Sequence, residues 1–137
     1  MDIVEQLQSL LATPLVEPER SELIFVYLPE PLDPMERHER YAEPLDAELR
    51  LRGYGYVSGG GSMLSEENPG GGHDIEWSGI DVDASDPPAA RELLRKHLPP
   101  LGCLPGTQLQ YRHGDQSLYD EYDGEHWTTG AKSIADD

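Results

Sequence analysis

The stretch ELIFVYL, residues 22–28, is a near-continuous apolar run made largely of β-branched and aromatic residues. It is too short for a buried helix, and Pro29 follows it directly. This composition is typical of a strand that is at least partly covered on both of its faces. We therefore expect residues 22–28 to form a central strand of a sheet.

A second strong strand is expected at IEWSGIDVDA, residues 75–84. Its apolar side chains change phase at Gly79, because two before it are odd-numbered and two after it are even-numbered. A one-residue β-bulge at Gly79 would return all four to one face. The four are Ile75, Trp77, Ile80 and Val82, and the acids left on the opposite face are Glu76, Asp81 and Asp83.

Helix signals occur at three places in the sequence. Pro44 and Gly53 are typical of the first turn and of the residue after the last turn, and they predict a helix over 43–52. Asp86 is a good N-cap, and Pro99 is a stop, so a helix is expected over 87–98. Apolar residues at helical spacing predict a short amphipathic helix over 2–12.

The remaining strands are expected at GYGYVSGGGSML (53–64), at 107–112 and, as a returning hairpin strand, at 118–122. The resulting order β-α-β-β-α-β is that of a ferredoxin-like α+β fold. It predicts an antiparallel sheet of order 4-1-3-2 with both helices on one face, the glycine-rich strand at an edge and a C-terminal hairpin strand added. We expect one domain over 1–137, with an N-terminal helix and connector to residue 21 and a flexible tail over 128–137.

The glycine-rich stretch does not have the spacing of a phosphate-binding loop. It reads G-x-G-x-x-x-G, no helix follows it, and it lacks the Lys-Ser or Lys-Thr ending of a P-loop. Seven acids and not one Lys or Arg occur between Gly53 and Ala90. We expect a bulged or kinked edge strand, or an edge that a partner's backbone approaches closely.

The charge balance narrows the class of partner. Ten basic residues against 27 acidic ones give a net charge of −17 in 137 residues. Nucleic acids and anionic membrane surfaces would be repelled, whereas a basic protein would be attracted. The apolar runs are too short to span a bilayer, and the N-terminus lacks the basic region of a secretory signal. A single cysteine, Cys103, fits a cytoplasmic location.

Acids interleaved with large aromatics mark the C-terminal region as a candidate partner-binding surface. Tyr and Trp anchor interfaces, and surrounding carboxylates steer and pair with Lys or Arg. A solvated acidic surface with its aromatics in the core is the open alternative. The partner-binding candidates are Tyr119, Asp120, Glu121, Tyr122, Asp123, Glu125 and Trp127, together with Glu66 and Glu67 of the loop before residue 75.

Catalytic and metal-binding motifs are not evident in the sequence. No Cys/His zinc spacing occurs, and we expect no cofactor. His73 with Asp74 and His113 with Asp115 would each supply two ligands, which leaves open a small-molecule or metal-binding protein that uses the free sheet face. Homodimerisation through the sheet is a third possibility.

Several segments together resemble a group of small acidic bacterial proteins for which no activity is assigned. The segments are YAEPLDAEL, GYGYVSGGGS, IEWSGIDVD, ELLRKHL and LPGTQLQY, which span residues 41–111. In size, charge and lack of a catalytic motif the chain is similar to immunity proteins of secreted toxins, which bind and silence a cognate effector. This similarity implies a non-enzymatic inhibitor that neutralises a basic toxin or effector.

Overall fold

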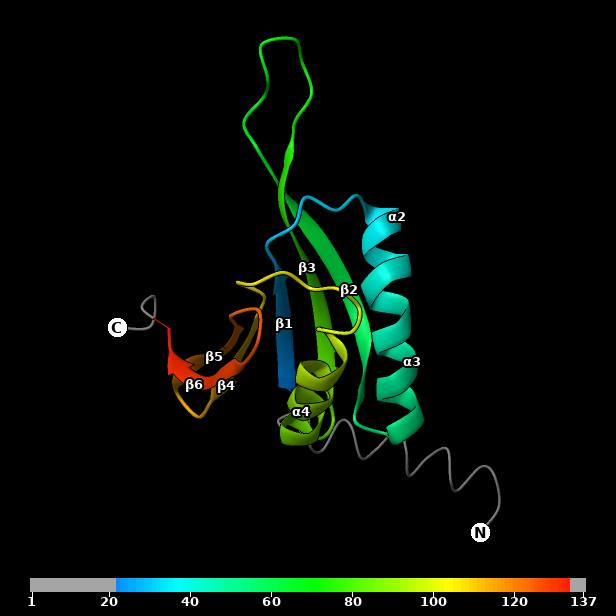
Figure 1. The fold of residues 1–137 in the computed structure, drawn as a ribbon, viewed down its shortest axis with the longest axis vertical. Coiled ribbons are helices and arrows are strands. Elements are labelled where there is room, and N and C mark those ends of the chain that lie inside the picture. The colour runs from blue at the N-terminus through cyan, green and yellow to red at the C-terminus, as the bar shows by residue number, and fades with distance from the viewer. Residues whose placement is uncertain (1–21, 134–137) are drawn as a thin grey trace.

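The computed structural model describes residues 22–133, which form an antiparallel sheet and two main helices (Figure 1). This arrangement confirms the α+β class. The strands are β1 (Glu22–Leu28), β2 (Gly55–Leu64), β3 (Ile75–Ala84), β4 (Gln108–His113), β5 (Gln116–Tyr122) and β6 (Trp127–Lys132). The helical segments are α2 (Pro34–Arg37), η2 (His38–Ala42), α3 (Glu43–Arg52) and α4 (Pro87–His97). The expected helix over 2–12 and its connector lie outside the described residues.

The sheet has six strands in the order β2-β3-β1-β4-β5-β6. Each neighbouring pair is antiparallel. The strands β1 and β3, which carry the two most apolar stretches, pair over seven residues in the interior of the sheet. β2 lies at one edge and β6 at the other. The sheet is therefore wider than expected from the sequence, because two strands follow β4 rather than one.

The expected flexible tail is wrong for its first residues, because Trp127–Lys132 forms β6 and pairs with β5. The segment WTTGAK has few apolar residues, and only Trp127 and Ala131 in it are half-buried. This segment becomes a strand because it pairs with β5, and its own sequence has no hydrophobic pattern that would predict a strand. Residues 134–137 lie outside the described part of the chain.

Local signals account for the helices. α3 has Pro44 in its first turn and ends at Gly53, whose left-handed conformation (φ 74°) lets its N–H bond back to the last turn. α4 is capped by Asp86, which accepts a hydrogen bond from the Ala89 N–H at 3.3 Å. An unexpected helical segment, α2, precedes η2 and α3. Asp33 caps it by accepting from the Glu36 N–H at 2.9 Å.

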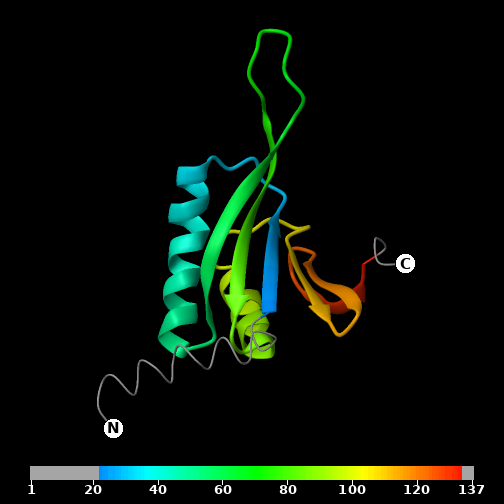
Figure 2. The same ribbon diagram turned by 180° about the vertical axis from the view of Figure 1, so that it is seen from behind.

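The hydrophobic core lies on one face of the sheet, between the strands and the helices α3 and α4. Figure 1 shows α3 alongside β2 and α4 in front of the lower ends of β1 and β3, and Figure 2 shows the same arrangement from behind. The core side chains of the strands include Ile24, Val26, Leu28, Ile80, Val82 and Leu109, and those of the helices include Leu45, Leu49, Leu93 and Leu94. We call this the helix-covered face.

The expected bulge at Gly79 is absent from the structure. β3 pairs with β1 in unbroken register from Ser78 to Ala84, so Trp77 lies on the opposite face from Ile80 and Val82. The irregularities of this hairpin lie instead in β2, between Val57 and Gly59 and between Met63 and Leu64. The glycine at position 79 serves a different purpose: the Phe25 ring of the neighbouring strand lies directly on it, and a Cβ there would clash with that ring.

Among residues 22–133, no helix is long and apolar enough to cross a membrane.

Candidate functional site

The second face of the sheet carries large side chains that no helix of the described residues covers. Alternation along β1 directs Leu23, Phe25 and Tyr27 to this side, while Ile24, Val26 and Leu28 point to the core. Leu23 is 54% exposed, and Phe25 and Tyr27 are half-buried. We call this side, with the residues that share it by register, the open face. From the other strands it includes Tyr56, Gly59, Gly61, Met63, Trp77, Asp81, Asp83, Gln108, Gln110, Tyr119 and Glu121.

Three aromatic rings pack together on the open face. Trp77 meets Phe25 edge to face, with the ring centroids 6.0 Å apart at an interplanar angle of 82°. Tyr27 also packs on the indole of Trp77, at a centroid distance of 5.2 Å and an interplanar angle of 54°. These separations are within the range of favourable aromatic pairs. The three rings together form a continuous aromatic surface on this side of the sheet.

Two carboxylates of β3 lie on the open face: Asp81 is next to the aromatic cluster, and Asp83 is two residues farther along the strand. Register places Asp81 directly opposite Phe25 and Asp83 directly opposite Leu23. Both are half-buried, and within residues 22–133 neither side chain has a hydrogen-bond or ion-pair partner. Unpaired carboxylates beside aromatic rings are suited to bind a cation, through ion pairing and through the ring faces.

The open face is hollowed on both sides of Phe25. A hollow of about 800 Å³ lies along β1, β4 and β5 and is lined by Leu23, Phe25, Gln110 and Tyr119 among others. A smaller hollow of about 230 Å³ lies toward β2, between Phe25 and Trp77, and Gly61 lines it. The first offers amide groups, aromatic surface and the charged side chains of Glu22 and Arg112, and the second offers aromatic surface and the Asp81 carboxylate.

Asp120 is wrong as a surface contact, because it is fully buried. Its Oδ2 accepts from Arg95 Nη1 at 2.7 Å, and its Oδ1 accepts from the Tyr111 hydroxyl and the Gly130 N–H, each at 2.8 Å. The period of two along β5 places it on the helix-covered face. It is an internal ion-pair partner that ties α4 to β4, β5 and β6.

The other C-terminal candidates are divided between the two faces. Tyr119 and Glu121 lie on the open face, where Glu121 accepts from Gln108 Nε2 at 2.7 Å. Tyr122 and Trp127 stack on one another at a centroid distance of 5.2 Å and pack against the core. The indole N–H of Trp127 is buried and has no partner within residues 22–133, so this side chain does not present its polar group to solvent.

Asp123 and Glu125 lie in the turn between β5 and β6 and are exposed. The Asp123 carboxylate accepts from the N–H groups of Glu125 and His126, at 2.8 and 2.7 Å. The backbone donors of His126 and Glu125 lower the pKa of Asp123. Asp123 therefore shapes its own turn, whereas the Glu125 carboxylate lies 4.0 Å from His126 Nδ1.

Glu66 and Glu67 are far from the C-terminal candidates. They lie in the loop of the β2–β3 hairpin, which projects well beyond the rest of the sheet, as Figure 1 shows. They are exposed. The nine predicted contact residues therefore do not form one surface.

The histidine pairs lie at opposite ends of the sheet. His73 and Asp74 are in the hairpin loop beyond the end of β1, whereas His113 and Asp115 are at the turn between β4 and β5, near the start of β1. Within residues 22–133 no group of three or more His, Cys, Asp or Glu side chains is arranged to hold a metal ion. The structure does not bring these four residues together.

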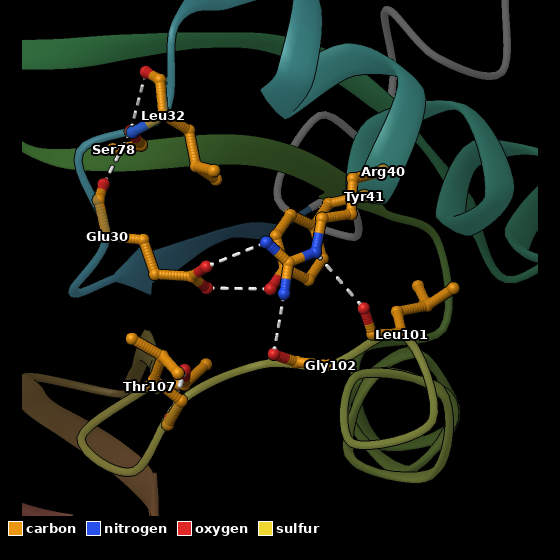
Figure 3. Close-up of polar contacts among 9 residues, drawn as sticks. Glu30, Leu32, Arg40, Tyr41, Ser78, Leu101, Gly102 and Thr107 are labelled. Atoms are coloured by element: carbon orange, nitrogen blue, oxygen red, sulfur yellow. Dashed lines mark hydrogen bonds and ion pairs between the residues drawn. The ribbon is translucent and has the colours of Figure 1, made fainter.

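A buried polar cluster lies where β1 meets the helices (Figure 3). Glu30 is 5% exposed, and its two carboxylate oxygens accept from the Tyr41 hydroxyl at 2.6 Å and from Arg40 Nη1 at 3.1 Å. Arg40 also donates to the carbonyl oxygens of Leu101 and Gly102. Both oxygens of the Glu30 carboxylate have partners, so we interpret this cluster as a structural connection rather than a reactive site.

Two neighbours of this cluster complete the structural interpretation. The Ser78 hydroxyl bonds to the backbone of Glu30 and Leu32, which fixes the chain as it leaves β1. Cys103 is a buried free thiol, and burial raises its pKa above the ordinary value. A thiol of that kind is a poor nucleophile.

Comparison with protein-family models, curated proteins and solved structures finds no match to this chain.

Proposed function

We propose that this chain is a non-enzymatic binding protein whose open face engages a basic protein, as an immunity or inhibitor protein engages a basic toxin or effector. One observation carries the proposal: the aromatic cluster of Phe25, Tyr27 and Trp77 lies on an uncovered sheet face beside Asp81, with Asp83 farther along the same strand, and neither carboxylate has a partner in residues 22–133. Aromatic anchors surrounded by carboxylates are suited to Lys- and Arg-bearing surfaces.

The overall charge supports a basic partner. A net charge of −17 attracts a cationic protein over about 8–10 Å in physiological salt and repels nucleic acid and other acidic surfaces. The carboxylates of the open face then pair with the partner at short range. Negative charge thus acts twice: the net charge attracts the basic partner from a distance, and the carboxylates of the open face form ion pairs with it on contact.

A ferredoxin-like unit extended by two strands is the fold that we infer for this binding protein. The order β2-β3-β1-β4 within the sheet supports it, as does the position of α3 between β1 and β2 and of α4 between β3 and β4 along the chain. In this interpretation β5 and β6 lengthen the sheet and enlarge its open face.

A small-molecule ligand on the open face is the second candidate. It is favoured by the hollow of about 800 Å³ along β1, β4 and β5, which is within the size range of ligand pockets.

A cytoplasmic location and a homodimer formed through the sheet are further parts of the proposal. Sedimentation of the purified chain measures the oligomeric state.

Matched charge variants test the proposed function. The immobilised chain captures basic proteins from an extract of its source organism, and the captured protein is purified for affinity measurements. The double variant Asp81→Asn/Asp83→Asn is compared with Glu39→Gln/Glu92→Gln, which removes two exposed acids of the helical segments, away from the open face. We expect the first to raise the Kd about tenfold and the second less than about twofold.

Salt dependence gives the second readout of the same experiment. We expect the affinity for the captured protein to fall steeply between 50 and 300 mM salt, because the interaction is electrostatically assisted. Equal Kd values for the two double variants, or an affinity that does not change with salt, would contradict the proposal. Tighter binding of a small molecule than of any protein would favour the second candidate.

A further inference from the structure

The glycines of β2 lie at the edge of the sheet and have a hollow on each side of them. On the open face, the hollow of about 230 Å³ is lined by Gly60, Gly61 and Ser62. On the other side, a hollow of about 380 Å³ lies between this edge and the helices and is lined by Ser58, Gly59 and Gly60. β2 has a strand neighbour on one side only, so both hollows flank a sheet edge.

The two hollows exist because three successive residues of β2 have no side chain. Gly61 faces the open face, and a Cβ there would meet nothing within 4 Å. Gly60 faces the helices, and the Arg37 side chain lies across it, with its Nε 3.1 Å from where a Cβ would be. Arg37 is held in place by its hydrogen bond to the Ser62 hydroxyl at 3.1 Å. A side chain at either glycine would occupy one of the hollows.

The outward-pointing backbone groups of β2 have a partner at Val57, and those farther along the strand do not. The Val57 N–H points away from β3 and donates to Asp46 Oδ1 of α3 at 2.8 Å. The register places Gly60 and Ser62 on the same sheet face as Val57, so their N–H and C=O groups point to the same outer side. No bond from these groups to a helix or a loop is found within residues 22–133.

We propose that an extended peptide segment carrying Lys or Arg adds to β2 along Gly59–Met63 as a further strand of the sheet. Its main chain bonds to Gly60 and Ser62, and its alternate side chains enter the two hollows. The basic side chain enters the hollow on the open face, where Phe25, Trp77 and the unpaired Asp81 carboxylate lie together. Main-chain bonds supply affinity in this mode of binding, and the pockets for alternate side chains supply specificity.

Charge selects a basic segment of another protein rather than a second copy of this chain. Two copies of a chain of net charge −17 repel one another, and pairing of two β2 edges would bring glycines together with no cation for Asp81. A Lys or Arg of the partner instead meets a carboxylate and an indole at the same point. The inference rests on the proposed function, because it needs a basic partner, and it adds the place and geometry of binding.

A selection from random linear peptides tests this inference. Dodecapeptides displayed on phage are selected on the full wild-type chain, and the enriched sequences are synthesised as probes. We expect them to carry Lys or Arg within an alternating β-branched pattern. Binding is then measured on Gly61→Phe, which places a ring at the open-face hollow from a position where a Cβ meets nothing within 4 Å, and on Gly70→Phe, a matched control in the hairpin loop.

The expected result separates the edge from the rest of the molecule. Gly61→Phe weakens the affinity for the probes by more than about tenfold, and Gly70→Phe changes that affinity by less than about twofold. N-methylation of alternate probe amides on one side of its strand abolishes binding, whereas N-methylation on the other side does not. Amide exchange slows at Gly60 and Ser62 when the probe is bound.

Other outcomes overturn the strand addition and show whether the proposed function survives. Probes that bind Gly61→Phe normally, or that tolerate N-methylation at every amide, overturn it. If those probes are nevertheless weakened by Asp81→Asn/Asp83→Asn, the open face still binds basic partners in another geometry. A selection without enriched peptides, or a dimer in sedimentation that Gly61→Phe abolishes, also overturns the inference.

Discussion

On the helix-covered face, the carboxylates of Glu30 and Asp120 are almost fully buried, and donors engage both oxygens of each. On the open face, the carboxylates of Asp81 and Asp83 are half-buried and have no partner in residues 22–133. A buried charge without a partner costs several kcal/mol, whereas an accessible one is hydrated and can exchange its water for a cation. The same residue type therefore serves stability on one face and recognition on the other.

Aromatic residues differ between the two faces in the same way. Tyr41 and Tyr111 on the helix-covered face are buried, and each hydroxyl donates to a carboxylate. Phe25 and Trp77 on the open face pack on one another, and both are only half-buried. This comparison makes a general prediction: substitutions on the helix-covered face change the free energy of unfolding, and those on the open face change binding.

The largest expected effect on stability is that of Asp120→Ala. It leaves Arg95, the Tyr111 hydroxyl and the Gly130 N–H without their shared acceptor, and we expect a loss of about 3 kcal/mol in the free energy of unfolding. Urea unfolding followed by circular dichroism measures it. Asp81→Ala, which removes a half-buried carboxylate of the open face that has no partner within residues 22–133, is the control and should cost much less. Equal losses would contradict the division between the faces.

Alkaline pH is expected to weaken the helix-covered face through Tyr41. Burial, together with the hydrogen bond to Glu30, raises the pKa of Tyr41 above its ordinary value. Above pH 10 the unfolded chain loses this proton while the folded chain keeps it, so stability falls with rising pH by about 1.4 kcal/mol per unit. Denaturant melts between pH 9 and 12 measure the slope.

The matching control for the alkaline prediction is Tyr41→Phe. This variant is less stable than the wild type at pH 8, because Glu30 loses a donor, but its stability should fall less steeply above pH 10. Tyr111, whose pKa is also raised by burial, keeps part of the slope in both proteins. Parallel slopes for the two proteins would show that Tyr41 ionises alike in the folded and unfolded chains.

Much of the fold was predictable because its signals are local. The bounds of β1, β3 and α3 follow from apolar runs and from Pro and Gly at the helix ends, and the structure has them at the expected residues. The helical segment from Pro34 was missed, although Asp33, Pro34 and Glu36 form a recognisable start signal. The β6 strand could not be predicted in this way, because its own sequence has little hydrophobic pattern.

The candidate site was harder to predict because it depends on neighbouring strands. The phase change in β3 suggested a bulge at Gly79, but the glycine makes room for Phe25, which comes from another strand. That error placed Trp77 on the core side, so the aromatic cluster on the free sheet face was missed. The burial of Asp120 could have been predicted from the sequence, because alternation puts it on the same side of β5 as Leu118 and Tyr122.

The smallest expected effects are those of substitutions at Gly60 and Gly61. These two adjacent residues face opposite sides of β2, so their variants allow a direct comparison of the two sides. A Cβ at Gly60 would lie 2.8 Å from the Gly79 carbonyl oxygen, which is backbone and cannot easily move. We expect Gly60→Ala to lower the free energy of unfolding by about 1–2 kcal/mol through this overpacking. Gly61→Ala meets no atom within 4 Å, so it should be neutral or stabilise by about 0.5 kcal/mol, because the unfolded chain loses freedom.

Urea melts of Gly60→Ala and Gly61→Ala under identical conditions check this contrast, and the difference between the two variants matters more than either value. Equal losses would mean that β2 needs glycine for its own backbone conformation, and the bare edge would then be a requirement of folding. A loss at Gly60 alone means that nothing in the fold requires glycine at Gly61. An absent side chain that folding does not need is expected where another chain comes close, which is the role that strand addition along Gly59–Met63 assigns to this edge.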